Sequence, residues 1–242
     1  MTNPASPEAA YPVEPRSRAR RKHERAAYDH ASVHAVLDAG MLAHVSYVID
    51  GQPYATPTIH WREGTRLYWH GSSASRMLRA QAAGVPVCVT VAMLDGLVMA
   101  RTGMNHSANY RSAMCFGNAA LVEGAEEKRA ALLAMIDRFF PGRNETLRGF
   151  SDPDIKATKV VGMEIETAVA KVRTGLNGDE PEDLANPTWA GVIPVTQVIG
   201  DRLPCPHNGA EAIPSGLSAW TPGRSFDETM AELARLYEVE PA

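Results

Sequence analysis

The sequence has few cysteines, and none of them stand at the spacing of a metal or redox pair. Cys88, Cys115 and Cys205 form no CxxC motif. The first two lie in apolar runs, where a free cysteine usually behaves as a small buried hydrophobe. This usage favours a reducing compartment, and we expect a cytoplasmic protein.

Long hydrophobic runs are also missing. One long stretch without charge, residues 80–94, contains Gln81, Gly84 and Pro86. It is shorter than the run of about 20 apolar residues that a membrane helix needs. The first residues hold no apolar core of the kind found in a secretory leader. We therefore expect no membrane segment.

The chain lacks both common nucleotide fingerprints, GxGxxG and GxxxxGK[ST], which disfavours dinucleotide folds and P-loop enzymes. A net charge of −4 argues against a dedicated nucleic-acid protein. Residues 1–27 are rich in Pro, Ala and Arg without apolar periodicity, which predicts a flexible basic arm. Six Lys or Arg residues fall within residues 16–25. We expect this arm to be a solvated tail that wraps a partner subunit. The alternative is that it binds nucleic acid.

What the sequence does contain is a succession of short β patterns. These segments are rich in Val, Ile, Thr and aromatic residues and are separated by Gly-containing turns, as in consecutive antiparallel hairpins. About six strands with few helices predict a mostly β protein built on a small antiparallel barrel. The expected strands cover residues 41–50, 53–62, 66–71, 85–93, 97–101, 109–123 and 158–174, with a turn at Asp95-Gly96 and a bulge at Gly117.

Helical patterns are fewer. Asp29 can cap a helix whose apolar positions are Val33, Val36 and Leu37 and which ends at Gly40. Further helices are expected over residues 75–83 and 126–140, from Ser151, and over residues 226–237. We divide the chain into the arm at 1–27, a barrel domain at 28–200, and a Pro/Gly-rich tail with an amphipathic helix at 201–242.

The most informative segment is LYWHGSSASRMLR at residues 67–79. It predicts a strand ending in the rings of Trp69 and His70, then a Gly/Ser turn into a helix with Ser75 and Arg76 at its start. A helix N-terminus carries partial positive charge and unsatisfied N–H donors, so it suits a phosphate. The alternative is an ordinary strand–turn–helix with a capping Ser75 and a solvated Arg76.

This segment resembles the pyridoxamine-phosphate-oxidase-like flavoproteins, and most closely their subgroup of 5-nitroimidazole-resistance proteins. Four further motifs support the resemblance, which spans residues 23–200: PVCVTVAMLDGLV at 86–98, HSANYRS at 106–112, KVRTG at 171–175 and WAGVIP at 189–194. The resemblance implies a six-stranded antiparallel split β-barrel. It also implies a homodimer that binds FMN in two equivalent interface clefts.

Site residues follow from the resemblance position by position. The phosphate pair falls on Ser75 and Arg76, and the catalytic position on His70. The remaining flavin contacts are the strand Pro57, Thr58 and Ile59 along the isoalloxazine ring, Trp69 and His70 at the strand end, and Ser112 at the ring edge. Met77 replaces a lysine of the oxidases, and their C-terminal substrate signature is not recognisable. These departures disfavour oxidation of pyridoxamine phosphate itself.

Two hypotheses of different classes follow. The first is an FMN-dependent oxidoreductase acting on a small molecule, with nitroaromatic reduction as one candidate. The second is a non-catalytic or differently loaded protein that holds haem or the deazaflavin F420. A metal site formed by His44, His60 and His70 is not expected, because no acidic partner or HxH spacing supports it.

Overall fold

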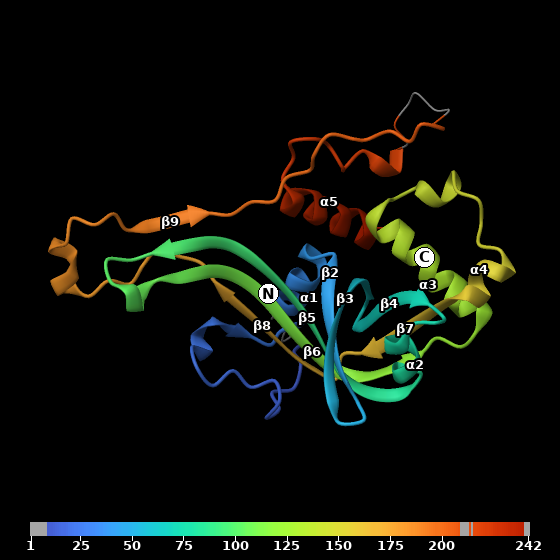
Figure 1. Ribbon diagram of the computed structural model, residues 1–242, viewed down its shortest axis with the longest axis horizontal. Coiled ribbons are helices and arrows are strands. Elements are labelled where there is room, and N and C mark those ends of the chain that lie inside the picture. The colour runs from blue at the N-terminus through green and yellow to red at the C-terminus, as the bar shows by residue number, and fades with distance from the viewer. Residues whose placement is uncertain (1–8, 209–212, 214, 240–242) are drawn as a thin grey trace, which may run out of the picture.

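The structure is a computed structural model that describes residues 9–208, 213 and 215–239 (Figure 1). Nine strands form one antiparallel sheet in the order β1-β8-β6-β7-β4-β3-β2-β5-β9, and β5 also pairs with β6. The strands are β1 Ala26–Ala27, β2 Leu42–Ile49, β3 Gln52–Glu63, β4 Arg66–Ser72, β5 Ala83–Met99, β6 Ser107–Leu121, β7 Thr158–Glu164, β8 Thr167–Arg173 and β9 Gly191–Pro194.

Six of these strands close a ring. The β5–β6 pairing joins the two ends of the series β6-β7-β4-β3-β2-β5, which gives the expected split barrel. Closure depends on short ladders: β3 and β4 share four residue pairs, and β2 and β5 share three. The expected fold class, mostly β with helices, is confirmed.

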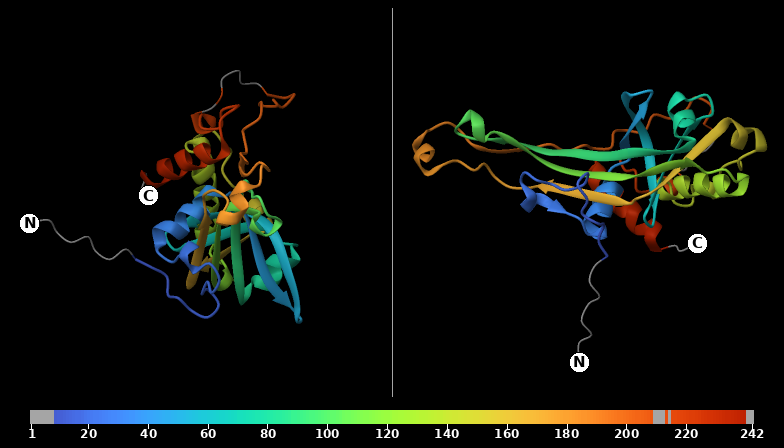
Figure 2. Two further views of the ribbon diagram at one scale, coloured as in Figure 1. Left: turned by 90° about the vertical axis from the view of Figure 1, so that its left-hand side faces the viewer. Right: turned by 90° about the horizontal axis from the view of Figure 1, so that it is seen from below.

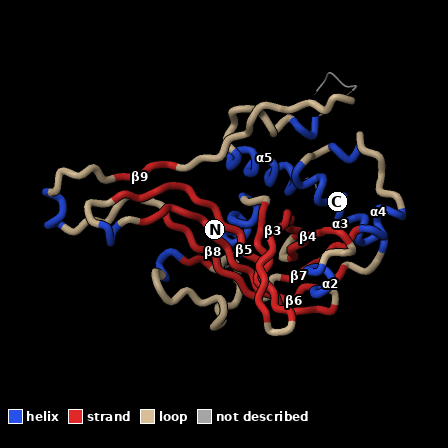
Figure 3. Tube along the Cα trace, in the orientation of Figure 1, coloured by secondary structure: helices blue, strands red, loops and turns tan. Residues whose placement is uncertain are grey.

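The helices cover the barrel from two directions. They are α1 His30–Ala39, α2 Arg76–Gln81, α3 Ala125–Phe139, α4 Asp152–Ala157 and α5 Phe226–Val239. Short helical turns lie at His23–Arg25, Gly103–Asn105, Arg143–Glu145, Pro181–Ala185 and Ser215–Leu217. Figure 3 shows that the longer helices lie at the barrel, whereas the far end of the β5–β6 hairpin carries only short turns.

Two apolar cores result from this arrangement. The first fills the barrel interior, where Val33 and Leu37 of α1 meet Trp69 of β4 and Leu78 of α2. The second lies between the opposite face of the sheet and helices α3 and α5, and includes Trp61 and Tyr68 with Met230 and Leu233. The C-terminal amphipathic helix therefore docks on its own chain, because its apolar stripe completes this second core.

The strand pattern differs from expectation at two places. Asp95-Gly96 does not form a turn, because β5 continues through it with a bulge between Leu94 and Gly96. Figure 2 shows the resulting long hairpin of β5 and β6 extending away from the barrel together with β9. The expected single strand at 158–174 is two strands, since β7 pairs with β4 while β8 pairs with β6.

Gly117 shows a third difference. No register shift occurs there, so the expected bulge is absent. A Cβ at this position would lie 2.8 Å from the Cγ atom of Met163 and would overlap the carbonyl oxygen of Glu164. Glycine is needed at this point because β6 passes directly against the end of β7.

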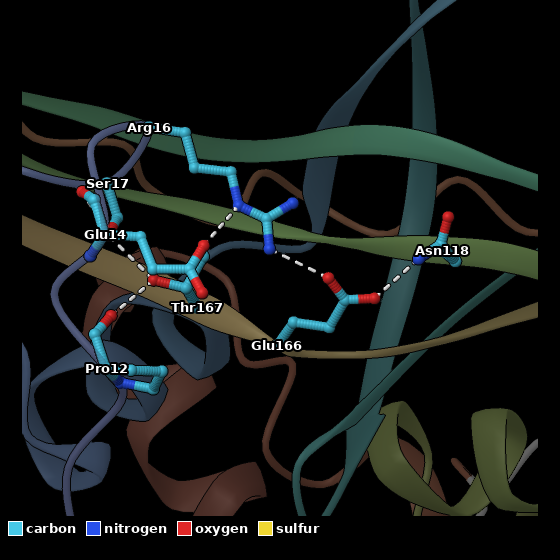
Figure 4. Close-up of polar contacts among 7 residues, drawn as sticks. All are labelled: Pro12, Glu14, Arg16, Ser17, Asn118, Glu166 and Thr167. Carbon is cyan, nitrogen blue, oxygen red and sulfur yellow. Dashed lines mark hydrogen bonds and ion pairs between the residues drawn. The ribbon is translucent and has the colours of Figure 1, made fainter.

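The described part of the basic arm, residues 9–27, lies against the barrel (Figure 4). Tyr11 and Ser17 are buried, and the hydroxyl of Thr167 contacts the Ser17 hydroxyl at 2.7 Å. Arg16 donates to Glu166 at 2.8 Å, and Asn118 donates to the same carboxylate at 2.6 Å. Composition alone predicts a flexible segment; in the structure Tyr11 packs on His30 and His34 of α1, and the bonds to Glu166 and Thr167 join the segment to the start of β8.

None of the described helices is both long enough and apolar enough to cross a membrane.

Candidate functional site

The barrel is open between β3 and β4. Their ladder runs from Glu63 opposite Arg66 to His60 opposite Trp69, and there it ends. Beyond that point, β4 pairs with β7 alone, and the Gln52–Ile59 part of β3 pairs with β2 alone. Within the described residues, the two facing strand edges therefore lack a strand partner. Thr58 and Ile59 pair with Ala43 and Leu42 of β2, and the Ile59 carbonyl oxygen accepts from the Thr58 hydroxyl at 3.3 Å, so only the edge of β3 that faces β4 is open to a flat ligand.

Helix α2 begins on the β4 side of this split. The Ser75 hydroxyl caps it by accepting from the N–H of Leu78 at 3.5 Å. The N–H groups of Arg76 and Met77 are the first two of the helix and have no acceptor within it. The helix start thus offers backbone donors and a hydroxyl next to the open strand edge.

Arg76 carries a positive charge that no carboxylate of the described residues neutralises. The side chain is exposed, and its guanidinium carbon lies 4.5 Å from the ring centroid of Tyr54 on β3. Tyr54 in turn stacks on Tyr47, with centroids 5.5 Å apart. A cation at a helix N-terminus is unfavourable for the helix dipole unless an anion binds nearby. Arg76 therefore fits the phosphate of a ligand that bridges α2 and β3.

His70 lies at the end of the β4 segment that faces the split. The centroid of its ring is 6.1 Å from the centroid of the Trp61 ring. Its Nδ1 atom is buried without a hydrogen-bond partner among the described residues. Burial lowers the pKa of His70, so the imidazole is neutral at neutral pH. A buried polar atom without a partner is costly, so this nitrogen fits a group supplied by a ligand.

Trp69 faces the opposite way. Its side chain is fully buried in the barrel interior, and its Nε1–H donates to Oε1 of Gln81 at 3.0 Å. The contact ties β4 to α2 and so fixes the position of the turn that carries Ser75. The structure places Trp69 behind the site wall rather than on its surface.

Ser112 lies on β6, paired with Ala92 of β5 and Lys171 of β8. Its hydroxyl donates to the carbonyl oxygen of Lys171 at 3.3 Å. Among the described residues, no contact joins Ser112 to Arg76 or His70. Ser75, Arg76 and His70 therefore lie on the β4–α2 side of the split and Pro57, Thr58 and Ile59 on β3, whereas Trp69 lies in the barrel core and Ser112 on β6.

One outer face of the sheet carries Pro57 and Ile59 of β3 together with Ser112 of β6. Pro57, His44, Thr90 and Met114 pair in a row across β3, β2, β5 and β6, so their side chains share one face. The same face carries exposed apolar side chains. They are Leu42 at 53%, Val48 at 60%, Ile59 at 41%, Leu94 at 49% and Met114 at 40%.

Arg111 of β6 forms two ion pairs. Its guanidinium donates to Asp95 at 2.7 Å and to Asp227 at 2.6 Å. Asp227 belongs to α5, 116 residues further along the chain. This network clamps the C-terminal helix to the long hairpin. No local pattern indicates so distant a pair.

The three histidines considered for a metal site lie apart. His44 is exposed on the outer sheet face, whereas His60 is buried against α1 and His70 lies beside Trp61. Among the described residues, no three His, Cys, Asp or Glu side chains gather in a metal-binding arrangement.

Comparison with known proteins places this geometry in context. The sequence profile of the family described as Pyridoxamine 5'-phosphate oxidase matches residues 29–172. None of the curated proteins matches the chain.

Solved structures are similar over more of the chain. The flavocytochrome Anf3 from Azotobacter vinelandii is 41% identical, with a TM-score of 0.81, over 90% of this chain and 100% of that chain. The FAD and haem binding protein from Mycobacterium smegmatis is 35% identical, with a TM-score of 0.78, over 84% of this chain and 98% of that one. A putative 5-nitroimidazole antibiotic resistance protein from Bacteroides thetaiotaomicron is 25% identical, with a TM-score of 0.52, over 64% of this chain and 90% of that one.

Proposed function

Because the chain belongs to the pyridoxamine 5'-phosphate oxidase family, we propose that it is a redox protein that binds a flavin nucleotide and a haem. The observation that carries the flavin is the split between β3 and β4 beside the unneutralised Arg76. The haem is supported by two relatives described as a flavocytochrome and as a FAD and haem binding protein, which are 41% and 35% identical.

The residues at the split fit a phosphorylated flavin. Arg76 and the Ser75 hydroxyl, with the free N–H groups of the first helical turn, would bind the phosphate. The open backbone edge at Pro57, Thr58 and Ile59 would bind the polar edge of the ring. When bound, a flavin supplies hydride and electron transfer, while the protein binds it, orients it and excludes water.

His70 is the residue that we assign to the chemistry. Since its imidazole is neutral, the unpartnered Nδ1 can donate or accept one hydrogen bond, depending on the tautomer. The resemblance places this position beside the flavin. His70 would therefore hold a proton or orient a substrate at the ring.

The resemblance predicts FMN, whereas the 35% identical relative is described as binding FAD. Both nucleotides present a phosphate to Arg76, so the site at α2 does not separate them. Mass spectrometry of the nucleotide released on denaturation decides between FMN and FAD.

A second copy of the chain is the partner that we propose. Pro57, Ile59 and Ser112 lie on the outer sheet face, and exposed apolar residues surround them. Large exposed apolar patches commonly mark interaction surfaces. Ser112 does not reach the split within its own chain, so the Ser112 of a partner copy would complete the site in a homodimer.

The substrate is a small molecule, and nitroaromatic reduction is the candidate that the resemblance supplies. To test it, the bound flavin is first reduced with dithionite, excess dithionite is removed, and a nitroimidazole is added without oxygen; the reduced flavin should be reoxidised as the drug's absorbance falls. We also propose a cytoplasmic location, since Cys88, Cys115 and Cys205 are all free thiols.

The absorption spectrum of the purified protein tests the proposal as a whole. We expect flavin bands together with a Soret band that sharpens on reduction with dithionite. If the protein is isolated colourless, it should take up flavin and hemin on titration. A folded protein that binds neither FMN, FAD nor hemin would contradict the proposal.

A further inference from the structure

The C-terminal extension crosses part of the outer sheet face that carries Leu42, His44 and Leu94, and together they line a cavity of about 510 Å³. In Figure 1 the chain from β9 to α5 runs above β5, and the N–H of Val195 bonds to the carbonyl oxygen of Asp95 at 3.1 Å. The sheet side of the cavity is formed by β2 and β5, including Leu42, His44 and Met93. Most of its lining is apolar. Its outer wall includes Val195, Thr196, Gln197 and Phe226.

Ion pairs hold the outer wall in place. Arg111, on the rim of the cavity, binds Asp95 of the hairpin and Asp227 of α5 at 2.7 and 2.6 Å. The N–H of Phe226 also donates to the carbonyl oxygen of Gln197 at 2.9 Å. The cavity is therefore a built feature of this chain, with walls from the barrel and from the extension.

His44 is the histidine in this cavity. It pairs with Pro57 on one side and Thr90 on the other, so its side chain lies on the outer face. The side chain is exposed and has no hydrogen-bond partner among the described residues. An imidazole with both nitrogens available, facing an apolar space, has the chemistry of an axial haem ligand.

The comparisons connect haem with the extension. The two relatives described as a flavocytochrome and as a FAD and haem binding protein match 90% and 84% of this chain, which reaches beyond the barrel. The relative described as a nitroimidazole resistance protein matches 64%. The two larger shares exceed that of residues 28–200 alone, so the match to the two haem-binding relatives extends beyond the barrel domain.

On the basis of the proposed function, we infer that His44 is an axial ligand of the haem, which occupies the cavity between the barrel and the C-terminal extension. Since His44 pairs directly with Pro57, the haem would lie next to the strand assigned to the flavin ring. The two cofactors would then be held on neighbouring strands of one sheet.

Other histidines fit this role less well. His34 lines a larger cavity of about 720 Å³, but its Nε2 is bonded to the Tyr11 hydroxyl at 2.7 Å. The Nε2 of His34 is thus already engaged, whereas neither nitrogen of His44 is engaged by any of the described residues. His60 is buried in the barrel wall, and His70 is assigned to the flavin.

The test compares His44→Ala with His106→Ala. His106 is an exposed histidine on the far end of the hairpin, bonded to the carbonyl oxygen of Thr102 at 2.8 Å, and serves as the matched control. Each protein is reconstituted with hemin, and the ratio of haem to protein, the Soret position and the electron paramagnetic resonance spectrum are measured. The ratio of flavin to protein shows whether each variant remains folded.

We expect His44→Ala to lose at least tenfold in hemin affinity or to change from a histidine-ligated spectrum, with flavin content unchanged. Added imidazole should restore the wild-type Soret position in His44→Ala. His106→Ala should match the wild type. If wild type binds hemin and His44→Ala keeps the same affinity and spectrum, the inference is wrong while the proposed function stands.

If His44→Ala also loses its flavin, His44→Gln keeps a polar side chain of similar size, and its spectrum decides in the same way. If wild type binds flavin but not hemin, the haem part of the proposed function fails, and this inference fails with it.

Discussion

At the scale of single residues, the site depends on groups that the rest of the chain leaves unsatisfied. Arg76 has a ring contact with Tyr54 but no carboxylate among the described residues, and His70 has a buried nitrogen without a partner. By contrast, the buried Trp69 has its N–H satisfied by Gln81. A buried polar group without a partner is costly, and at His70, which lies at the end of the β3–β4 ladder, a ligand could supply that partner.

Arg76→Ala should weaken flavin binding by about 1–3 kcal/mol, or roughly 5- to 150-fold, because it removes a charge-assisted hydrogen bond to the phosphate. Arg79→Ala is the matched control, since Arg79 is an exposed arginine of the same helix, one turn further along. Fluorescence titration of the apoprotein with flavin measures both. Equal affinities for the two variants would contradict the phosphate assignment.

The buried histidine His60 predicts a pH dependence of stability. Burial lowers its pKa to about 4, opposed by the nearby Asp38 carboxylate, while the unfolded value is about 6.5. Between these values the unfolded chain binds more protons, so the free energy of unfolding falls as the pH drops from 6.5 to 4. The loss from His60 alone is at most about 3 kcal/mol.

Urea denaturation at pH 7.5 and pH 5 measures this dependence. His60→Gln should reduce the difference between the two pH values, because glutamine does not titrate. A variant whose stability falls as steeply with acid as the wild type would show that other groups cause the effect.

At the scale of elements, the site exists because two strands separate. β3 and β4 share four residue pairs, and then β4 continues against β7 while β3 continues against β2. Hairpin periodicity in the sequence predicts that both strands form, but it does not show where their ladder ends. The end of the ladder is set by neighbouring strands that are distant in sequence.

The contact of β6 with the end of β7 gives a prediction at this scale. Gly117→Ala should lower the free energy of unfolding by about 1–3 kcal/mol, since the added methyl would press on Met163 and the Glu164 carbonyl. Gly103→Ala is the control, because a Cβ there meets nothing within 4 Å. Thermal unfolding of the two variants compares them. A Gly117→Ala protein as stable as the control would contradict this account of β6.

At the scale of the whole molecule, the outer face across β3, β2, β5 and β6 is the main feature. It joins the flavin strand, the cavity beneath the C-terminal extension, and Ser112. A monomer would leave these exposed apolar side chains in water, at a cost of roughly 25 cal/mol for each Å² that a partner could cover. Assembly and cofactor binding are therefore expected to depend on each other.

Met114→Glu should convert the proposed dimer to a monomer and lower its flavin content, because a charge buried in an interface is costly. Leu203→Glu is the control, since Leu203 is an apolar residue that is 93% exposed outside the sheet. Light scattering coupled to size exclusion gives the mass of each protein. Dimers with full flavin content in both variants would show that this face is not the interface.

The sequence by itself determined the fold class, most element positions and the helix start at Ser75 and Arg76. Strand alternation, the Asp29 cap and the apolar stripe of α5 are local signals, and each led to an element at its expected place. The motif at 67–79 places Ser75 and Arg76 at a helix start for the same reason.

Only the tertiary structure decided what those residues face. The continuation of β5 through Asp95-Gly96 depends on pairing with β6 and β9, and the Arg111–Asp227 pair joins residues far apart in sequence. His44 gains an apolar cavity only when the extension returns across the sheet. Periodicity indicates which side of a helix or strand is apolar. Which other element covers that side is determined by the packing of the whole chain.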